Sequence, residues 1–330
     1  MMYTRPKVTT SVTEKAVTPI PRKTVRQQRL KLAVKNWQLY IFLLVPVAYL
    51  LIFRYYPMLG VQIAFKKFNA AKGIWGSPWV EFYNFEKFFK SYQFSRVISN
   101  TLSLSFYGLL AGFPIPIILG LCLNALRSQR YKKLAQTIIY VPHFISTVVL
   151  VGIVLQVFNP LVGVYGVLYS LATNGNIAPD ILGKATAFSH MYVWSGVWQN
   201  MGWGTIIYVA ALSSVENELH EAAQIDGASR FKRVIHIDLP KIFPTATTLL
   251  ILNAGSIMNV GFEKVYLMQN SLNLRQSEVI STYVYKIGLA AGGGDFSYAT
   301  AIGLFNSIIN FMLLVTVNWI SKKISSTSLW

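Results

Sequence analysis

Residues 101–125 read TLSLSFYGLLAGFPIPIILGLCLNA and contain no Asp, Glu, Lys or Arg. A helix needs about 20 such residues to cross a hydrocarbon core about 30 Å thick. Five further runs of similar length carry almost no charge, so the sequence predicts six membrane-spanning helices. The six runs cover 37–56, 101–125, 134–158, 188–212, 244–260 (with an extension to 268 left open) and 296–320.

The composition supports a membrane protein. Hydrophobic residues make up 53% of the 330 positions and charged residues only 13%, against roughly 25% charged in soluble domains. Helices satisfy their own backbone hydrogen bonds, so six of them can share one bilayer. The predicted fold class is therefore all-α and polytopic, and the net charge of +18 is interpreted as topology and not as nucleic-acid binding.

The basic residues are unevenly distributed. Of the 30 Lys and Arg residues, 19 lie before the first run, after the sixth, or in the links that follow the second and fourth runs. Short loops rich in Lys and Arg remain in the cytoplasm, which predicts that both termini and the loop 213–240 are cytoplasmic. Residues 1–35 form a basic, partly disordered tail suited to anionic lipid, and residues 36–330 form the six-span domain.

The loop between the fourth and fifth runs predicts two short helices. Ser213 and Glu216 have the spacing of a capping box, and Gly227 suits the left-handed turn that closes a helix. Ser229 can cap a second helix, which Pro240 is expected to end. Such a unit is either an amphipathic connector on the inner membrane surface or a face on which another protein docks.

The same segment resembles the EAA loop of permease subunits in binding-protein-dependent ABC importers. This resemblance implies a type I ABC importer permease fold, in which the loop is a coupling helix that inserts into an ATP-binding subunit. By resemblance, Glu221 would pair with a basic residue of that subunit and Gly227 would supply the turn. The positions that match the family pattern are Glu221, Ala222, Ala223, Asp226, Gly227, Ala228, Ile237, Leu239 and Pro240.

Further segments are similar to the maltose-type, carbohydrate-uptake branch of these permeases. They include residues 79–89 and Tyr140-Val141-Pro142-His143, while residues 56–58 and 63–65 look most like permeases for oligosaccharides of plant or algal polysaccharides. The resemblance implies a bacterial inner-membrane location and an oligosaccharide substrate. Basic residues in the outer loops would tolerate an acidic, uronate-type sugar: Lys66, Lys67, Lys72, Lys87 and Lys90.

The partners follow from the same resemblance. A second homologous permease would complete a heterodimer, with two ATP-binding subunits below it and a solute-binding protein above it. ATP and Mg²⁺ would be bound by the ATPase, because this chain has no phosphate-binding Gly-x-x-x-x-Gly-Lys-Ser/Thr sequence. No enzyme activity, cofactor or metal site is expected from the chain itself, which lacks clustered His, Cys or acidic residues near the spans.

The span interiors carry no Asp, Glu, Lys or Arg that could bind a driving ion. A secondary carrier or channel working without an ATPase is the alternative. Sugar sites combine aromatic walls with a few placed polar groups, although amide side chains also mediate helix packing and Trp also anchors span ends. The candidate substrate pathway consists of Trp194, Trp198, Gln199, Asn200, Asn253, Ser256, Asn259, Asn306 and Asn310.

Overall fold

A computed structural model describes residues 35–126, 128–290 and 294–325. These residues are helical almost throughout, and within them the only extended pairing is a single bridge between Lys66 and Trp79. The all-α prediction is thus confirmed. The predicted basic tail, except for its last residue, lies outside the described residues. The chain divides into two units, Met1–Gly60 and Val61–Trp330.

The first unit contains the first predicted span. It consists of α2 (Trp37–Leu50), the π-helix η1 (Leu51–Tyr55) and α3 (Tyr56–Met58). Pro46 lies inside α2, and no residue of α2, η1 or α3 is buried. An apolar helix that exposes its side chains on every face is suited to lipid.

The second unit begins in a 3₁₀ helix, η2 (Leu59–Phe65), and continues through α4 (Gly73–Gly76) and α5 (Tyr83–Lys90). The amphipathic helix α5 buries Phe85 and Phe88. It ends directly before α6, so the predicted second span starts at Tyr92, nine residues earlier than the apolar run indicates.

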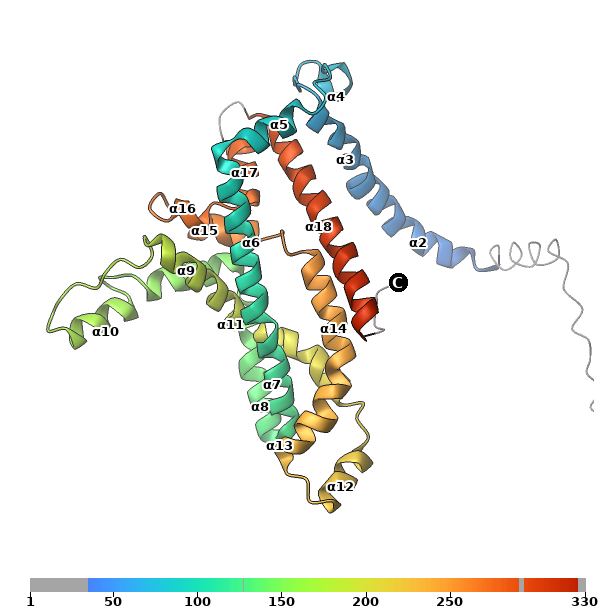
Figure 1. Ribbon diagram of the computed structural model, residues 1–330, viewed down its shortest axis with the longest axis vertical. Coiled ribbons are helices and arrows are strands. Elements are labelled where there is room, and N and C mark those ends of the chain that lie inside the picture. The colour runs from blue at the N-terminus through green and yellow to red at the C-terminus, as the bar shows by residue number, and fades with distance from the viewer. Residues whose placement is uncertain (1–34, 127, 291–293, 326–330) are drawn as a thin grey trace, which may run out of the picture. The chain divides into compact units, whose positions relative to one another are not determined.

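The second span is a continuous 34-residue helical segment made of α6 (Tyr92–Gly112) and α7 (Pro114–Ala125). It packs along α11 (Ala185–Leu212), the fourth predicted span (Figure 1). A Cβ at Gly120 would lie 3.1 Å from the Cβ of Tyr208. The missing side chain therefore allows close helix packing, as is common in membrane proteins.

The prediction of one continuous helix over 134–158 is wrong. Instead, α8 (Gln129–Tyr140) and the 3₁₀ turn η3 (Val141–Phe144) are followed by α9 (Thr147–Val157) after a bend of 98°. Ser146 has an extended backbone and its Oγ accepts a hydrogen bond from the Val149 amide at 3.3 Å. This N-cap starts a new helix and so stabilises the break.

The fifth span also differs from its prediction. Helix α13 (Arg230–Arg233), the π-helix η4 (Val234–Asp238) and α14 (Leu239–Gly255) form one 26-residue segment, so Pro240 does not end a helix. Pro240 follows the π-helix η4 closely, and such local π geometry lets a membrane helix continue past a proline. The segment ends at Gly255, and a separate helix follows at α15 (Phe262–Met268).

The sixth span is α18 (Phe296–Ser325), which lies beside α14 (Figure 1). In the described ranges, four helices are long and apolar enough to cross a membrane, or five if the bent α8–α9 pair is one span. Helix α11, the fourth predicted span, has 28 residues and is not among these four. The remaining elements are α10 (Val164–Ala172), α12 (Asn217–Ile225), α16 (Leu274–Ser277), α17 (Ile280–Tyr285) and η5 (Lys286–Ala290).

Candidate functional site

The predicted coupling loop is built from α12, a glycine turn and α13. Gly227 has a φ of +76°, the left-handed conformation in which glycine is least strained. Its amide donates to the Gln224 carbonyl at 3.1 Å, and the Ala228 amide donates to the Ala223 carbonyl at 2.9 Å. The prediction that glycine closes this helix is therefore confirmed.

Of the two helix caps predicted in this loop, one is confirmed and one is wrong. Ser229 Oγ accepts a hydrogen bond from the Lys232 amide at 3.3 Å and caps α13, as predicted. The Ser213–Glu216 capping box is wrong, because Glu216 itself is the N-cap of α12 and makes no side-chain cap bond. Ser213 lies at the end of α11 and donates to the Val209 carbonyl, a local bond that competes with capping.

The tip of the loop is exposed and carries apolar side chains. Glu221, Asp226 and Gly227 are exposed, while Ile225 and Phe231 are 87% and 74% exposed. Large apolar residues exposed next to a rigid turn favour docking to another protein. This arrangement suits the coupling role that the resemblance implies for these residues.

Behind the tip, a buried carboxylate ties the loop to the spans. His220 Nε2 lies 3.2 Å from Asp238 Oδ1, and Asn124 Nδ2 donates to the same oxygen at 3.4 Å. Asp238 is 3% exposed and lines a cavity of about 400 Å³ with Arg230 and Arg233. The loop is therefore held against the ends of α7 and α14, a contact that no sequence motif indicated.

Three of the predicted pathway residues, Asn259, Asn306 and Asn310, contact one another across the fifth and sixth predicted spans. Asn259 Oδ1 accepts from Asn306 Nδ2 at 3.2 Å and from Asn310 Nδ2 at 3.0 Å. The Oδ1 atom of Asn310 accepts from the Met258 amide at 3.0 Å. These bonds support the non-helical stretch that follows α14, where backbone groups would otherwise be unsatisfied.

A cavity of about 320 Å³ opens beside this stretch and is lined by both apolar and polar side chains; we name it the first polar cavity for its amide and hydroxyl groups. Its walls come from α6, α11 and the segment between α14 and α15. Small residues of α6 make room for it, and amide and hydroxyl groups face it. The lining includes Ser105, Gly108, Gly112, Tyr192, Asn253, Ser256 and Asn259.

A second cavity of about 270 Å³ shares Gly108, Gly112 and Tyr192 with the first and is lined also by Gln199, Asn200 and Lys264. Gln199 Nε2 donates to the Ile145 carbonyl at 2.7 Å, in the break between η3 and α9. Asn200 Oδ1 lies 3.1 Å from His143 Nδ1. Five of the nine predicted pathway residues thus line the two cavities, and sequence reasoning missed Lys264.

Trp194 and Trp198 lie elsewhere. They line an apolar cavity of about 550 Å³ formed with α9. Trp194 Nε1 donates to the Tyr107 hydroxyl at 2.8 Å, and that hydroxyl lies 2.9 Å from His190 Nδ1. The structure does not bring these two tryptophans to the polar cavities, and their sugar contact stays a prediction.

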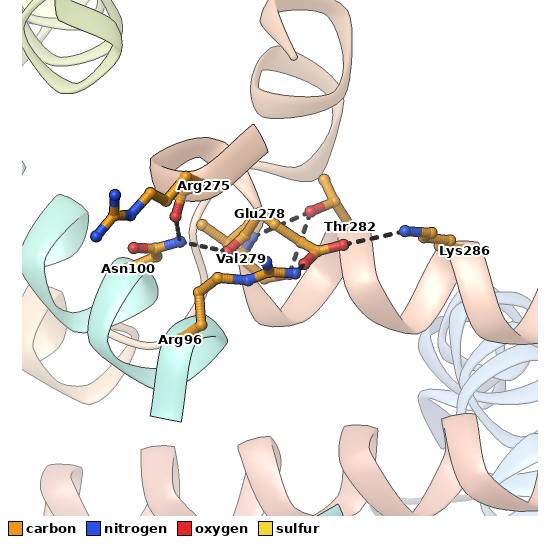
Figure 2. Close-up of polar contacts among 7 residues, drawn as sticks. All are labelled: Arg96, Asn100, Arg275, Glu278, Val279, Thr282 and Lys286. Atoms are coloured by element: carbon orange, nitrogen blue, oxygen red, sulfur yellow. Dashed lines mark hydrogen bonds and ion pairs between the residues drawn. The ribbon is translucent and has the colours of Figure 1, made fainter. Parts of the chain in front are cut away.

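An ionic network joins the start of α6 to the α16–α17 hairpin (Figure 2). Glu278, which is 1% exposed, pairs with Arg96 and with Lys286, whose Nζ lies 3.4 Å from Oε1. Asn100 Nδ2 donates to the carbonyls of Arg275 and Glu278 at 3.0 and 2.9 Å. Figure 2 shows these groups converging from α6 and the hairpin, so the network fixes the hairpin against the second span.

Comparison with known proteins identifies the chain. A model of the family "Binding-protein-dependent transport system inner membrane component" matches residues 112–326. The chain belongs to this family. The matched residues include the predicted coupling loop and most of the residues that line the two polar cavities, whereas Ser105 and Gly108 of α6 lie before the match.

Relatives match the permease over nearly its whole length. Protein LplB of Bacillus subtilis is 44% identical over 292 residues, covering 88% of this chain and 91% of that protein. The polygalacturonan/rhamnogalacturonan transport system permease protein YteP of the same organism is 37% identical, covering 92% and 95%.

Solved structures give the same result. A chain of a bacterial ABC transporter involved in the import of the acidic polysaccharide alginate is 38% identical, with a TM-score of 0.82, and the match covers 90% of this permease and 99% of that chain. A second structure contains that alginate transporter with an alginate pentasaccharide-bound periplasmic protein, also at 38% identity and a TM-score of 0.82. The type I importer permease fold is thereby shown.

Proposed function

We propose that this permease imports oligosaccharides, including acidic, uronate-type ones, as one membrane subunit of an ATP-driven importer. The observation that carries the proposal is the pair of polar cavities among α6, α11 and the α14–α15 break. Their amide and hydroxyl groups match sugar hydroxyls, and Tyr192 supplies an aromatic wall. The names of YteP and of the alginate transporter support a polysaccharide-derived substrate.

The energy would come from outside the chain. Two ATP-binding subunits, which would hold ATP and Mg²⁺, dock on the exposed loop around Glu221, Ile225 and Phe231. This chain binds neither and is not itself an enzyme. A second homologous permease completes the central cavity, and a solute-binding protein delivers the sugar from outside. The subunit lies in the bacterial inner membrane with both termini in the cytoplasm.

Coupling follows from the contacts of the loop. Closure of the ATPase moves α12, and the bonds of His220 and Asn124 to Asp238 pass this motion to α7 and α14. Because these helices carry or adjoin the cavity walls, the cavity alternates between its outward and inward states. ATP shifts the balance only through its different affinity for the two states.

The experiment is uptake by purified protein in proteoliposomes. The complete complex, with the sugar-loaded binding protein outside and ATP inside, should accumulate labelled oligosaccharide, whereas the isolated chain should not. Accumulation by the isolated chain would instead identify a secondary carrier. Failure of the chain to co-purify with an ATP-binding subunit would also contradict the proposal.

A further inference from the structure

Lys264 is a buried cation in the wall of the second cavity. Its side chain is 8% exposed, and Nζ donates to the Tyr192 carbonyl at 2.7 Å while lying 4.7 Å from the centre of the Tyr192 ring. A Cβ at Gly196 would lie only 3.0 Å from Nζ. The absence of a side chain at Gly196 thus leaves the ammonium room beside the cavity.

No carboxylate of the described residues pairs with this ammonium. Within the described residues, the basic partners of the carboxylate ion pairs are Lys87, Lys90, Arg96, Lys286 and His220. A carbonyl and a ring face satisfy an ammonium only in part, and a buried charge without a counter-ion is costly. A buried ionisable group in the wall of a cavity is therefore a candidate for ligand binding.

The surroundings of Lys264 fit a sugar that carries a carboxylate. Gln199 and Asn200 line the same cavity, and Tyr192 also lines the neighbouring cavity of Asn253 and Asn259. One fixed positive charge among amides and hydroxyls matches a uronate ring, which has one carboxylate among several hydroxyl groups. Charge-assisted hydrogen bonds to carboxylate are also stronger than neutral ones.

We propose that Lys264 is a specificity-determining residue that binds a carboxylate of the transported sugar and so makes this permease prefer uronate oligosaccharides over neutral ones. The inference rests on the proposed oligosaccharide import and names the substrate class of that same cavity. Burial lowers the pKa of the Lys264 ammonium to about 8. The group is therefore still mostly charged at neutral pH, and a bound carboxylate would raise its pKa again.

The test compares an acid with its own neutral form. The complete complex in proteoliposomes is given labelled uronate trisaccharides derived from pectate and from alginate, each as the free acid and as the full methyl ester. Wild type should take up at least one of the acids faster than its ester. Lys264→Met should lower uptake of that acid at least tenfold and leave ester uptake within about twofold, while Lys264→Arg should keep the preference for the acid.

Lys66 offers a matched control. Lys66 was counted among the outer-loop cations that would tolerate an acidic sugar, but the structure buries it away from both polar cavities. It is 2% exposed, donates to the Ile74 carbonyl at 2.8 Å and lies over the Trp79 ring. Lys66→Met should therefore change uptake of acid and ester by the same factor. If Lys264→Met also lowers both equally, Lys264 serves only packing and the inference is overturned.

The remaining outcomes distinguish a failure of the proposed role of Lys264 from a failure of the proposed oligosaccharide import. Equal wild-type uptake of acid and ester, or a preference for the ester, overturns the role of Lys264 while oligosaccharide import stands. The wild-type comparison of acid with ester does not need the variant, so it still tests the role of Lys264 if Lys264→Met fails to assemble. Equal uptake of acid and ester together with failed assembly would indicate that Lys264 pairs with a counter-ion on the second permease. If the wild-type complex moves no oligosaccharide of either form, the proposed function itself fails.

Discussion

Replacing Gly227 with valine should uncouple the importer. The turn holds a φ of +76°, and a Cβ at this position would meet no atom within 4 Å. The penalty is therefore conformational and not steric. An L residue in the left-handed region costs about 1–2 kcal/mol, and a β-branched side chain lies at or above the upper end of that range. A cost of about 2 kcal/mol would reduce the population of the native turn roughly 30-fold.

The assay measures two quantities on the assembled complex. Uptake, and the stimulation of ATP hydrolysis by loaded binding protein, should both fall in Gly227→Val, while membrane insertion and basal hydrolysis persist. Gly227→Ala should be intermediate. The control is Gly152→Val in α9, where an added Cβ also meets nothing within 4 Å but φ is not in the left-handed region. Uptake by Gly227→Val equal to that of the control would refute the coupling role of the turn.

Three further predictions test the contact of His220 and Asn124 with Asp238, the ionic network around Glu278, and the buried Lys264. Asp238→Ala removes the oxygen that His220 and Asn124 both contact. The loop then loses this contact with the spans, so uptake should fall more than basal ATP hydrolysis does. Glu278→Gln leaves the Arg96 guanidinium without its counter-charge, and because breaking a buried pair costs about 3–5 kcal/mol, the Tm of the purified complex should fall clearly. Lys264 loses its charge as pH rises through a pKa of about 8, so uptake of a uronate trisaccharide should fall several-fold between pH 7 and pH 9 in wild type.

The predictions for Glu278 and for the pH dependence each have a matched comparison. The exposed pair of Lys90 and Glu86 spans one turn of α5, and Glu86→Gln should barely change the Tm, since exposed pairs contribute at most about 1 kcal/mol. For the pH dependence, Lys264→Met should show no fall over the same interval. An equal fall in the variant would mean that another group titrates, and an unchanged Tm for Glu278→Gln would mean that the network carries no stability.

Much of the fold was predictable because it depends on local sequence. Apolar runs located the helices near their observed positions, and Gly227 and Ser229 indicated the turn and the cap through backbone and hydrogen-bonding preferences of single residues. The break at Ser146 was missed because hydropathy averages Pro142, His143, Ser146 and Thr147 into an otherwise apolar run. A change in backbone direction requires no change in composition.

The site was predictable only in part, because burial is a property of the assembled helices. Helical spacing places Asn306 and Asn310 on one face of α18, but their hydrogen bonds to Asn259 depend on how α18 packs against the end of α14. Lys264 lies in the stretch up to residue 268 whose inclusion in the fifth span was left open, and nothing in the sequence places it against Tyr192. The buried position of Asp238 likewise depends on α7 and on the loop, which are distant along the chain.

The amides beside the first cavity have a consequence for engineering. Asn310 accepts a hydrogen bond from the Met258 amide and, with Asn306, donates to Asn259, which lines the first cavity. The side chains that adjoin this cavity therefore also support the chain break after α14. Substitutions at these asparagines that aim to change selectivity would also disturb the backbone that lines the first cavity. New specificities are therefore more readily obtained at positions such as Ser105 on the opposite wall, whose side chain supports no chain break.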